Sequence, residues 1–518
     1  MPNSGPVPDA GRTRPAHPTR TPLAQLAAVL QLAPSPLGGV DVAVTGLALS
    51  SQRVVPGDLY AALPGARAHG ATYVGQAIAA GAVAVLTDPQ GAAMLSSYDV
   101  PVPVPVLVVG EPRTVLGALA ARVYGDPAAD LTLMAVTGTQ GKTTTTHLLA
   151  SGLEAAGVTA AVVGTVGTRI AGQEVATALT TPEAPDLHAL FAVMREEHVR
   201  GCAMEVSSHA LVLGRVDGVV FDVAAFANLG RDHLDFHASV QEYFAAKASL
   251  FFPERSKRGL TNVDDEHGRA LLDIARVPMR TFSASGAAAD WRAVDVGLRP
   301  DGARFTVLPP LGEPIAAGVP LTGAYNVANA LCAIALAGEA GFDPALVAAG
   351  IAEMAGVPGR LERVDAGQDF LAVVDYAHKP DAIAAALQAL RPLTDGRLLV
   401  VLGAGGDRDT GKRPMMGDVA ARLADVLLVT DDNPRTEDPR RIRAAVLAGA
   451  GGVAADQRGE VIEVGGRREA IRYAVSLARP GDTLVVAGKG HETGQEIHET
   501  VHPFDDREEL RAALEELR

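Results

Sequence analysis

The chain has 518 residues, enough for about three domains, and its net charge of −15 argues against a general nucleic-acid binder. Two cysteines are too few for a disulfide framework, and their spacing does not suggest a zinc site. Every run of 18 residues contains proline, glycine or charge, so we expect no transmembrane helix. The sequence also lacks a signal-peptide pattern, and we expect a cytoplasmic protein, most simply a monomer.

The first part of the chain predicts a tail followed by a small domain. Residues 1–22 are rich in proline and arginine, which predicts a disordered tail. Residues 23–130 form the first predicted domain. It begins with a short helix over 22–32 and includes strands over 42–49 and 83–87. We find no catalytic cluster in this domain.

A phosphate-binding motif opens the second predicted domain, residues 131–356. An apolar run ends at Gly138, and a helix rich in alanine and leucine starts at Lys142. In such a strand–loop–helix arrangement the backbone N–H groups face an anion, the lysine reaches the outer phosphates, and Thr143 can bind Mg²⁺. Because position 136 is valine, the motif departs from the common P-loop pattern, and a glycine-rich turn before a helix is the alternative. The predicted ATP-binding residues here are Gly138, Thr139, Gln140, Gly141, Lys142, Thr143 and Thr144.

Strands and helices alternate through the rest of the second domain and through the third, residues 357–518. Predicted strands cover 158–168, 200–206, 221–228, 260–263, 371–374, 397–403, 426–430 and 483–487. Predicted helices cover 242–250, 326–341, 380–390, 415–423 and 506–517. The alternation predicts an α/β fold with parallel sheets, whose ligands bind at the carboxyl ends of the strands.

Two polar clusters follow strands of the second domain. One begins at Glu205 and includes Ser207, and the other spans 228–237 and includes His233. Glu205 and His233 could ligate Mg²⁺ beside Thr143, although Mg²⁺ usually keeps several waters. Ordinary loop polarity with helix caps is the alternative for each cluster.

Further polar groups lie near helix starts and strand ends. Asn326 and Asn329 either cap a helix or hydrogen-bond a base, and Arg360 could contact a phosphate. The glycines at 402–409 do not complete a dinucleotide fingerprint. The other segments of this kind are 374–381, 432–435 and 487–492. Taken singly, surface polarity explains each of them.

In this order the motifs resemble those of the Mur ligase family, the ATP-dependent ligases of peptidoglycan precursor synthesis. The resemblance spans residues 40–510 and includes Glu-Val-Ser-Ser-His from 205 and Gly-Arg-Leu-Glu from 359. Asp-Asn-Pro-Arg at 432–435 is typical of members that add diaminopimelate. The resemblance implies a small N-terminal domain that binds the uridine nucleotide, a central P-loop ATPase-type sheet, and a C-terminal Rossmann-like domain that brings the amino acid.

The implied reaction joins diaminopimelate to UDP-N-acetylmuramoyl-L-alanyl-D-glutamate through an acyl phosphate, with ATP and Mg²⁺. The alternatives are a sister ligase that adds lysine or D-alanyl-D-alanine, and a non-catalytic nucleotide-dependent switch. The predicted catalytic residues are Lys142, Lys247, His233 and Glu205. The predicted metal ligands are Thr143, Glu205, His233 and Lys247.

Matching motifs also assign the substrate contacts. For ATP, the residues beyond the phosphate loop are Asn326, Arg360, Tyr376 and His378. For the UDP-muramoyl-dipeptide, they are Ser51, His69, Thr180, Thr181, Ser207 and Arg215. For diaminopimelate, they are Arg408, Asp432, Asn433, Pro434, Arg435, Gly488 and Glu492. The family's Asp-Ser-Arg in the first domain reads Ser-Ser-Gln at 50–52 here, without its charges.

Lys247 lies in the predicted helix 242–250, where a solvated surface charge is the simplest interpretation. In the Mur ligases the lysine that matches this position is carbamylated. The modified side chain, N6-carboxylysine, is an anion and can ligate a metal, which an ammonium cannot do.

Overall fold

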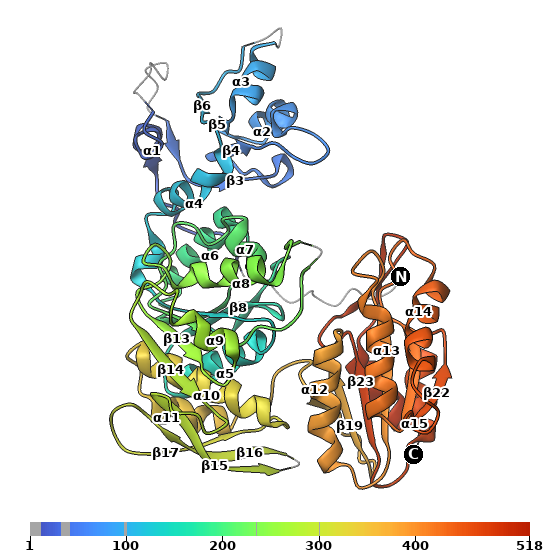
Figure 1. Ribbon diagram of the computed structural model, residues 1–518. Helices are drawn as coiled ribbons and strands as arrows, with labels where there is room; N and C mark the ends of the chain where they lie inside the picture. The colour runs from blue at the N-terminus through green and yellow to red at the C-terminus, as the bar shows by residue number, and fades with distance from the viewer. Residues whose placement is uncertain (1–11, 33–41, 98–100, 235, 300, 518) are drawn as a thin grey trace. The chain divides into compact units, whose positions relative to one another are not determined.

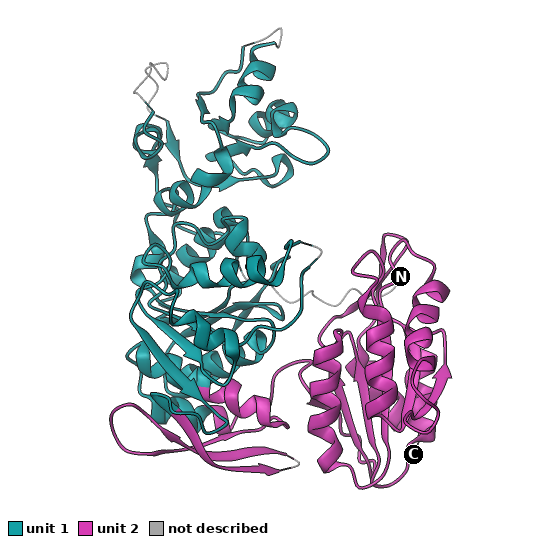
Figure 2. Ribbon diagram, in the orientation of Figure 1, with its two compact units in different colours: residues 1–291, 332–350 teal, residues 292–331, 351–518 magenta. Residues whose placement is uncertain are grey.

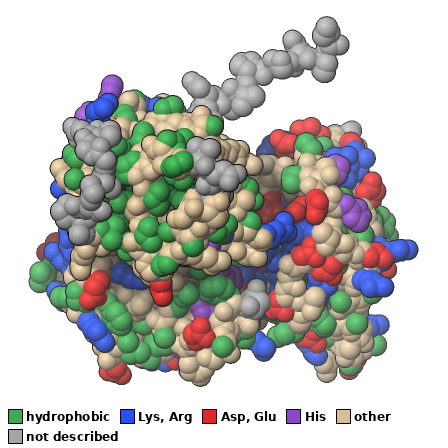
Figure 3. All heavy atoms as spheres, turned by 90° about the horizontal axis from the view of Figure 1, so that it is seen from above, with side chains coloured by type: hydrophobic (Ala, Val, Ile, Leu, Met, Phe, Trp, Pro, Cys, Tyr) green, Lys and Arg blue, Asp and Glu red, His purple; other side chains and the backbone are tan. Residues whose placement is uncertain are grey.

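The computed structural model describes residues 12–32, 42–97, 101–234, 236–299 and 301–517. Two compact units are evident (Figure 2): one comprises Met1–Trp291 with Cys332–Gly350, and the other comprises Arg292–Leu331 with Ile351–Arg518. The face seen in Figure 3 carries interspersed acidic and basic side chains. Among the described residues, no helix is both long and apolar enough to cross a membrane.

The first unit begins with a four-stranded parallel sheet in the order β3-β4-β5-β6 (Figure 1). Its strands are Gly46–Ala48, Asp58–Ala62, Ala84–Thr87 and Val106–Val108. The helices of this part are α1 (Leu23–Val29), α2 (Val74–Ala79), α3 (Pro89–Ser96) and α4 (Pro112–Val123). The predicted strand 42–49 is two strands, because β2 (Ala43–Val44) pairs with β1 (Thr21–Pro22) while β3 joins the sheet.

The segment before α1 differs from the predicted disordered tail. Residues 1–11 lie outside the described residues, but Arg14 pairs with the buried Asp58 at 2.6 Å. The backbone N–H groups of Ala16 and His17 donate to Glu196 at 2.9 and 2.8 Å. Composition suggested disorder because it contains no information about these acidic partners, which lie far away in sequence.

A larger sheet forms the rest of the first unit, in the order β10-β9-β8-β11-β7-β12-β13-β14. The strands are Gln173–Val175, Gly167–Ile170, Ala160–Gly164, Gly201–Glu205, Thr132–Thr137, Val223–Phe226, Gly259–Asn262 and Met279–Ser283. From β8 to β14 all neighbouring strands are parallel. The predicted strand 158–168 turns back after Gly164, so β9 runs antiparallel to β8.

Helices pack around this sheet and order its core. The principal ones are α5 (Lys142–Ala155), α6 (Ala184–Glu196), α7 (Ser208–Val212), α8 (Val240–Ala248) and α9 (Glu266–Leu271). Buried side chains of α6, including Leu187, Phe191 and Met194, pack in one cluster with Leu133 of β7 and Met204 of β11. The carboxyl ends of β7, β8, β11 and β12 therefore lie on one edge of a rigid sheet.

The second unit contains a six-stranded sheet in the order β18-β19-β23-β20-β21-β22, parallel except for β18. Its strands are Glu362–Arg363, Leu371–Asp375, Thr483–Ala487, Leu398–Ala404, Val426–Asp431 and Glu460–Glu463. One cluster joins the sheet to α12 (Pro380–Leu390), α13 (Lys412–Leu423) and α14 (Pro439–Gly451). The other joins it to α15 (Arg467–Leu477) and α16 (Asp506–Glu515), which gives the predicted doubly covered α/β sheet.

The sequence analysis missed several elements. An antiparallel meander is formed by β15 (Trp291–Arg299), β16 (Gly302–Leu308) and β17 (Ile315–Val319). A hairpin, β24 (Gly494–Ile497) with β25 (Thr500–Pro503), follows β23. The part of the chain that the structure describes also contains α10 (Ala324–Glu339), which was predicted, and α11 (Pro344–Ala352), which was not. The proposed division at 130 and 356 into three domains is finer than the two units and stays a prediction.

Candidate active site

The phosphate loop has the predicted strand–loop–helix form. β7 ends at Thr137, Gly138 and Gly141 take φ of 154° and 82°, and α5 starts at Lys142. The loop is held from the end of β12, where the Asn228 side chain accepts from Gln140 N at 2.9 Å and donates to Gln140 O at 3.2 Å. These bonds fix the loop before any ligand binds, which is what an anion-binding loop requires.

Two lysines converge on one carbonyl of this loop. Lys142 Nζ donates to Gly138 O at 2.9 Å and to Thr139 O at 3.2 Å. Lys247 Nζ, from α8, donates to the same Gly138 O at 2.8 Å. Lys247 is only 1% exposed, so the interpretation of this residue as a solvated surface charge is wrong.

Tyr243 lies one turn before Lys247 on α8 and connects it to the loop. The Lys247 ammonium lies 4.6 Å from the centre of the Tyr243 ring. The Tyr243 hydroxyl is 3.1 Å from Thr139 Oγ1, which also accepts from Gly230 N at 2.9 Å. Burial raises the pKa of Tyr243 above its ordinary value, so the phenol remains neutral at physiological pH.

Glu205 ends β11 and is fully buried. Its carboxylate accepts from Thr165 N at 2.7 Å and from Thr165 Oγ1 at 3.1 Å, just beyond the end of β8. A methyl group added at Gly164 would lie 2.3 Å from Glu205 Oε1, so this glycine makes room for the carboxylate. The sequence analysis did not identify Thr165 or Gly164, and their position directly after a parallel strand was the signal available.

Three predicted dipeptide-binding residues surround Glu205. Thr181 Oγ1 donates to Glu205 O at 2.9 Å and accepts from Ser207 N at 3.3 Å. Thr180 Oγ1 is 3.1 Å from Thr165 Oγ1. The structure therefore brings together residues that the sequence assigned to two different roles, metal binding and dipeptide binding.

His233 takes a left-handed backbone conformation, with φ 52°, and its Nε2 is 3.0 Å from Asp232 Oδ2. Its ring centre lies 4.7 Å from that of His209 and 6.0 Å from that of Tyr243. His233 therefore belongs to an aromatic cluster that reaches Lys247 through Tyr243. Within the described part of the chain, no group of three or more His, Cys, Asp and Glu side chains is placed to hold a metal. The predicted metal set has only two members of these types, Glu205 and His233, so it depends on Thr143 and Lys247.

Arg215, after α7, is held by Glu183. Arg215 Nε lies 2.9 Å from Glu183 Oε1, and Arg113 Nη1 lies 3.1 Å from Glu183 Oε2. Arg113 is in the first turn of α4, so this carboxylate connects the four-stranded sheet region to the region of the larger sheet.

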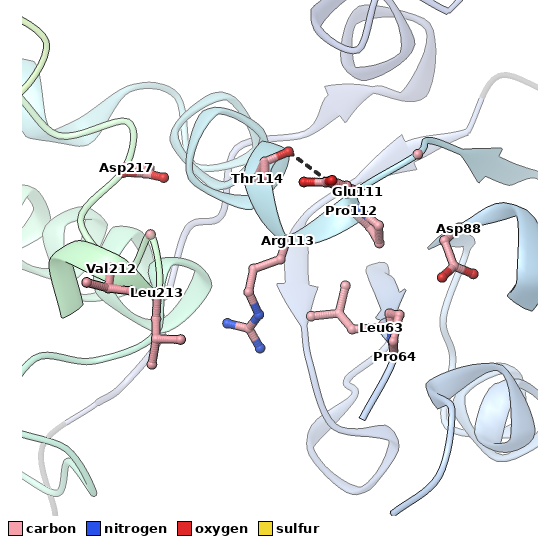
Figure 4. A pocket seen from close by; sticks show the side chains of 12 residues that line it. Leu63, Pro64, Asp88, Glu111, Pro112, Arg113, Thr114, Val212, Leu213 and Asp217 are labelled. Atoms are coloured by element: carbon pink, nitrogen blue, oxygen red, sulfur yellow. Dashed lines mark hydrogen bonds between the residues drawn. The ribbon is translucent and has the colours of Figure 1, made fainter. Parts of the chain in front are cut away.

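A cavity of about 420 Å³ lies at the carboxyl ends of β4, β5 and β6 (Figure 4). This is the edge of a parallel sheet at which ligands bind. Its lining comprises Leu63, Pro64, Asp88, Gly110, Glu111, Pro112, Arg113, Thr114, Val212, Leu213, Gly214 and Asp217. The sequence analysis named none of these residues.

The predicted uridine contacts in this region already have internal partners. Ser51 Oγ donates to Gln76 Oε1 at 2.9 Å. His69 Nδ1 accepts from Ala71 N, and its Nε2 is 3.0 Å from Oδ1 of Asp88, a cavity-lining residue. His69 therefore holds a residue that lines the cavity, whereas neither Ser51 nor Gln76 lines it. Direct contact of Ser51 or His69 with a nucleotide stays a prediction.

In the second unit, Arg360 and Tyr376 form a stacked pair. The Arg360 guanidinium lies 4.6 Å from the centre of the Tyr376 ring, whose centre is 4.6 Å from that of His378 and 5.1 Å from that of His491. Asp375 organises the loop by accepting from the backbone N–H groups of Leu361 and Ala377, both at 2.8 Å.

His378 is neutral at physiological pH. Burial, with Lys379 and Lys412 next in importance, lowers its pKa to about 3. Asn326 donates from Nδ2 to Thr322 O at 2.7 Å and accepts from Asn329 Nδ2 at 3.0 Å. Both asparagines therefore form local hydrogen bonds at the start of α10. The other interpretation, a hydrogen bond to a base, stays a prediction.

The loops after β21 and β23 bring together most of the predicted diaminopimelate residues. Asn433 Nδ2 donates to Glu492 Oε2 at 2.9 Å. Gly488 has φ 121°, and a methyl group there would lie 2.6 Å from Asp432 Oδ2. Pro434 lies between Asn433 and Arg435 in the first of these loops, and its carbonyl packs against Gly406.

Arg435 pairs with neither of the nearby acids Asp432 and Asp438. Its Nε lies 3.0 Å from Glu496 Oε2 of β24, and its Nη1 donates to Gly406 O at 2.6 Å. Asp438 pairs with Arg440 instead. Arg408 lies on the exposed loop after β20.

Models of Mur ligase domains match three segments that together cover most of the chain. The Mur ligase family catalytic domain matches residues 43–124, the Mur ligase middle domain matches 136–337, and the Mur ligase glutamate ligase domain matches 359–490. The chain belongs to the Mur ligase family. The resemblance inferred from the motifs is thus confirmed.

Similar Mur ligases extend over the same length. A UDP-N-acetylmuramoyl-L-alanyl-D-glutamate–2,6-diaminopimelate ligase from Streptomyces avermitilis is 55% identical, over 98% of this chain and 99% of its own. A UDP-N-acetylmuramyl-tripeptide synthetase from Leifsonia xyli is 44% identical, over 99% of each. A solved 2,6-diaminopimelate ligase structure is 31% identical, with a TM-score of 0.66, over 96% of this chain and 99% of its own.

In this Mur ligase one buried ion pair supports the loops after β21 and β23, which contain most of the residues assigned to diaminopimelate. Arg467 and Asp506 are fully buried, with Nε–Oδ1 and Nη2–Oδ2 distances of 2.7 and 2.6 Å. Arg467 also donates to Ala487 O at 3.0 Å and to Asp431 O at 3.3 Å. Since Ala487 and Asp431 are the last residues of β23 and β21, one guanidinium holds the starting points of the two loops.

Proposed function

We propose that this Mur ligase joins diaminopimelate to UDP-N-acetylmuramoyl-L-alanyl-D-glutamate by ATP-dependent amide formation. Full-length similarity to ligases named for this reaction supports the proposal. The observation that carries it to the amino acid is the pair of loops in which Arg435 and Glu492 supply opposite charges. Diaminopimelate differs from lysine by one carboxylate, so its far end needs both a cation and an anion.

The phosphate loop supports the ATP half of the reaction. The D-glutamyl carboxylate attacks the γ-phosphate and displaces ADP, which gives an acyl phosphate. The neutral amino group of diaminopimelate then attacks the acyl carbon, which forms the amide bond and releases inorganic phosphate and the proton of the amine. Both reactants in the first step are anions, so their repulsion must be neutralised. On binding ATP, Lys142 would exchange its contacts with the carbonyls of Gly138 and Thr139 for contacts with phosphate oxygens.

The residues around Lys247 fit Mg²⁺ binding if this lysine is carbamylated. Thr143, Glu205 and a carbamate on Lys247 would supply oxygen donors, which Mg²⁺ prefers. His233 fits less well as a direct ligand, because imidazole suits softer transition metals. When bound, Mg²⁺ supplies positive charge to the phosphate oxygens. A carbamate would also replace a buried cation by an anion that the ion neutralises.

The remaining residues are assigned to the muramoyl-dipeptide, to the nucleotide part of that substrate, and to ATP. Thr180, Thr181, Ser207 and Arg215 would hold the muramoyl-dipeptide, and their bonds to Thr165, Glu205 and Glu183 support that role. The cavity at the ends of β4, β5 and β6 is a second candidate for the nucleotide part, since its volume is in the range of small-molecule sites. Asn326, Arg360, Tyr376 and His378 would contact ATP.

A sister ligase that adds lysine is the closest alternative. The name of the Leifsonia xyli relative specifies no amino acid, which keeps this alternative open. A site built around Arg435 should nevertheless favour diaminopimelate, because lysine has no distal carboxylate to contact the guanidinium beyond its pair with Glu496.

The decisive experiment measures phosphate release with ATP, Mg²⁺, the UDP-muramoyl-dipeptide and a panel of amino acids. We expect release with diaminopimelate and little with lysine or D-alanyl-D-alanine. Lys142→Ala should lower turnover by about 10²–10³ with an unchanged circular dichroism spectrum. Comparable turnover with lysine, or wild-type turnover in Lys142→Ala, would contradict the proposal.

A further inference from the structure

Lys489 has contacts that the proposed chemistry does not use. It follows Gly488 in the loop after β23, and its side chain is fully buried. Its Nζ lies 2.9 Å from Asn433 Oδ1, 3.2 Å from Glu492 Oε2 and 3.8 Å from Asp432 Oδ1. All three partners belong to the predicted diaminopimelate set, so one ammonium joins the two loops that would hold the amino acid.

The contacts of Lys489 fix the orientation of Glu492. Lys489 Nζ and Asn433 Nδ2 both contact the same oxygen, Glu492 Oε2. The Glu492 side chain is 33% exposed, whereas those of Asp432 and Lys489 are 8% and 0% exposed. Of the two acids, Glu492 is thus the one that a ligand can reach, and the contacts from Lys489 and Asn433 set its geometry.

The same network extends to Arg435. Asn433 Oδ1 accepts from Lys489 Nζ and also from Glu496 N at 3.0 Å. Glu496 in turn pairs with Arg435 through its side chain, and Arg435 N donates to Glu496 O at 3.0 Å. The Asn433 side chain therefore connects Glu492, the proposed anion of the site, to Glu496, the partner of Arg435, which is the proposed cation. Lys489 is the charged group that holds Asn433 in this position.

We propose that Lys489 is a positioning residue for the amino-acid substrate. It holds Glu492 and the 432–433 segment in the arrangement that receives the distal ammonium of diaminopimelate, and it does not itself touch the substrate. A buried ammonium is costly unless it is paired, and here the pairing acids are those of the site. The inference rests on the proposed function and deepens it.

A purely structural role for Lys489 makes a different prediction. Loss of a residue that only stabilises the fold lowers the melting temperature and the amount of active enzyme, which reduces kcat for all substrates without selecting one KM. Loss of a positioning residue raises the KM for the positioned substrate alone. Comparison of the KM for diaminopimelate with the KM values for ATP and the UDP-muramoyl-dipeptide therefore distinguishes the two roles.

The principal variant is Lys489→Met, which removes the ammonium and keeps an unbranched side chain. We expect the KM for diaminopimelate to rise roughly 10- to 100-fold, the size of a lost hydrogen bond to a charged group. The KM values for ATP and the UDP-muramoyl-dipeptide should change less than about twofold, since the side-chain partners of Lys489 among the described residues are Asn433, Glu492 and Asp432, all assigned to diaminopimelate. Arg422→Met is the control, because it removes a surface cation of the same unit whose partners, Asp418 and Gln457, are assigned to no substrate.

Lys489→Arg covers the case in which Lys489→Met does not fold. It keeps the buried charge, but its larger head group must displace Glu492, so the KM for diaminopimelate should again rise selectively. In a Glu492→Gln background, Lys489→Met should add little further loss. An unchanged KM for diaminopimelate in a folded Lys489 variant, or an equal rise in all three KM values, overturns the inference. A wild-type enzyme inactive with diaminopimelate instead overturns the proposed function.

Discussion

Gly164→Ala tests whether the position of Glu205 governs catalysis. The added methyl group would lie 2.3 Å from Glu205 Oε1 and 3.0 Å from its Cδ. Ordinary contact requires the carboxylate to move by about 1 Å, which takes the 2.7 Å bond from Thr165 N beyond hydrogen-bonding distance. The φ of Gly164 is not in the left-handed region, so the effect acts through Glu205 rather than through backbone strain.

The expected losses follow from this displacement. Hydrogen bonds to charged groups contribute about 1.5–3 kcal/mol each, so weakening both Thr165 bonds should cost about 3 kcal/mol of unfolding free energy. A 1 Å misplacement of a catalytic group typically costs about 10² in rate. Urea unfolding measures the loss of unfolding free energy. Phosphate release, assayed over a range of Mg²⁺ concentrations at a temperature well below unfolding, measures the loss of rate.

Two controls make the result interpretable. Gly75→Ala, in α2, adds a methyl group to open space and should preserve turnover. In a Glu205→Ala background there is nothing to displace, so Gly164→Ala should cost little more. Wild-type turnover and stability in Gly164→Ala alone would refute the reasoning.

Three further substitutions probe other regions. Lys247→Ala should be largely inactive and partly rescued by small carboxylic acids, and an intact mass without added CO₂ in active wild-type enzyme would contradict carbamylation. Arg435→Ala should raise the KM for diaminopimelate far more than that for ATP, and equal changes in the two would contradict its assignment. Burial lowers the pKa of His188 to about 4 from 6.5, so its contribution to stability is complete above pH 6.5 and is lost as the pH falls towards 4. That contribution is about 3 kcal/mol. His188→Leu should therefore lose less unfolding free energy between pH 7 and pH 4 than the wild type does. The same loss in both proteins, measured by urea unfolding at each pH, would contradict the assignment.

Local motifs were predictable because their geometry is set by neighbouring residues. The glycines at 138 and 141 follow an apolar strand and precede a helix, which is sufficient to specify the phosphate loop. The boundaries of α12 and β23 were predicted to the residue, because proline or threonine starts each element and its apolar pattern is regular.

Contacts between distant segments could not be predicted from the sequence. Thr165 meets Glu205 only because β11 lies between β8 and β7 in the sheet, an order that no local pattern specifies. Glu496 becomes the partner of Arg435 because a hairpin absent from the sequence analysis returns beside the loop. The burial of Lys247 is of the same kind, since it depends on where α8 packs.

The buried pair of Arg467 and Asp506 also determines when, during synthesis, the loops assigned to diaminopimelate can reach their final structure. Chains fold largely from the N-terminus as they are synthesised. All the residues assigned to diaminopimelate precede Asp506, which begins the last helix, so they emerge while the guanidinium between their loops still lacks its counter-ion. A chain that stops at residue 505 would contain every residue assigned to diaminopimelate and would still leave Arg467 without its partner Asp506. The last helix contributes no assigned contact, yet the loops depend on its first residue for their final form.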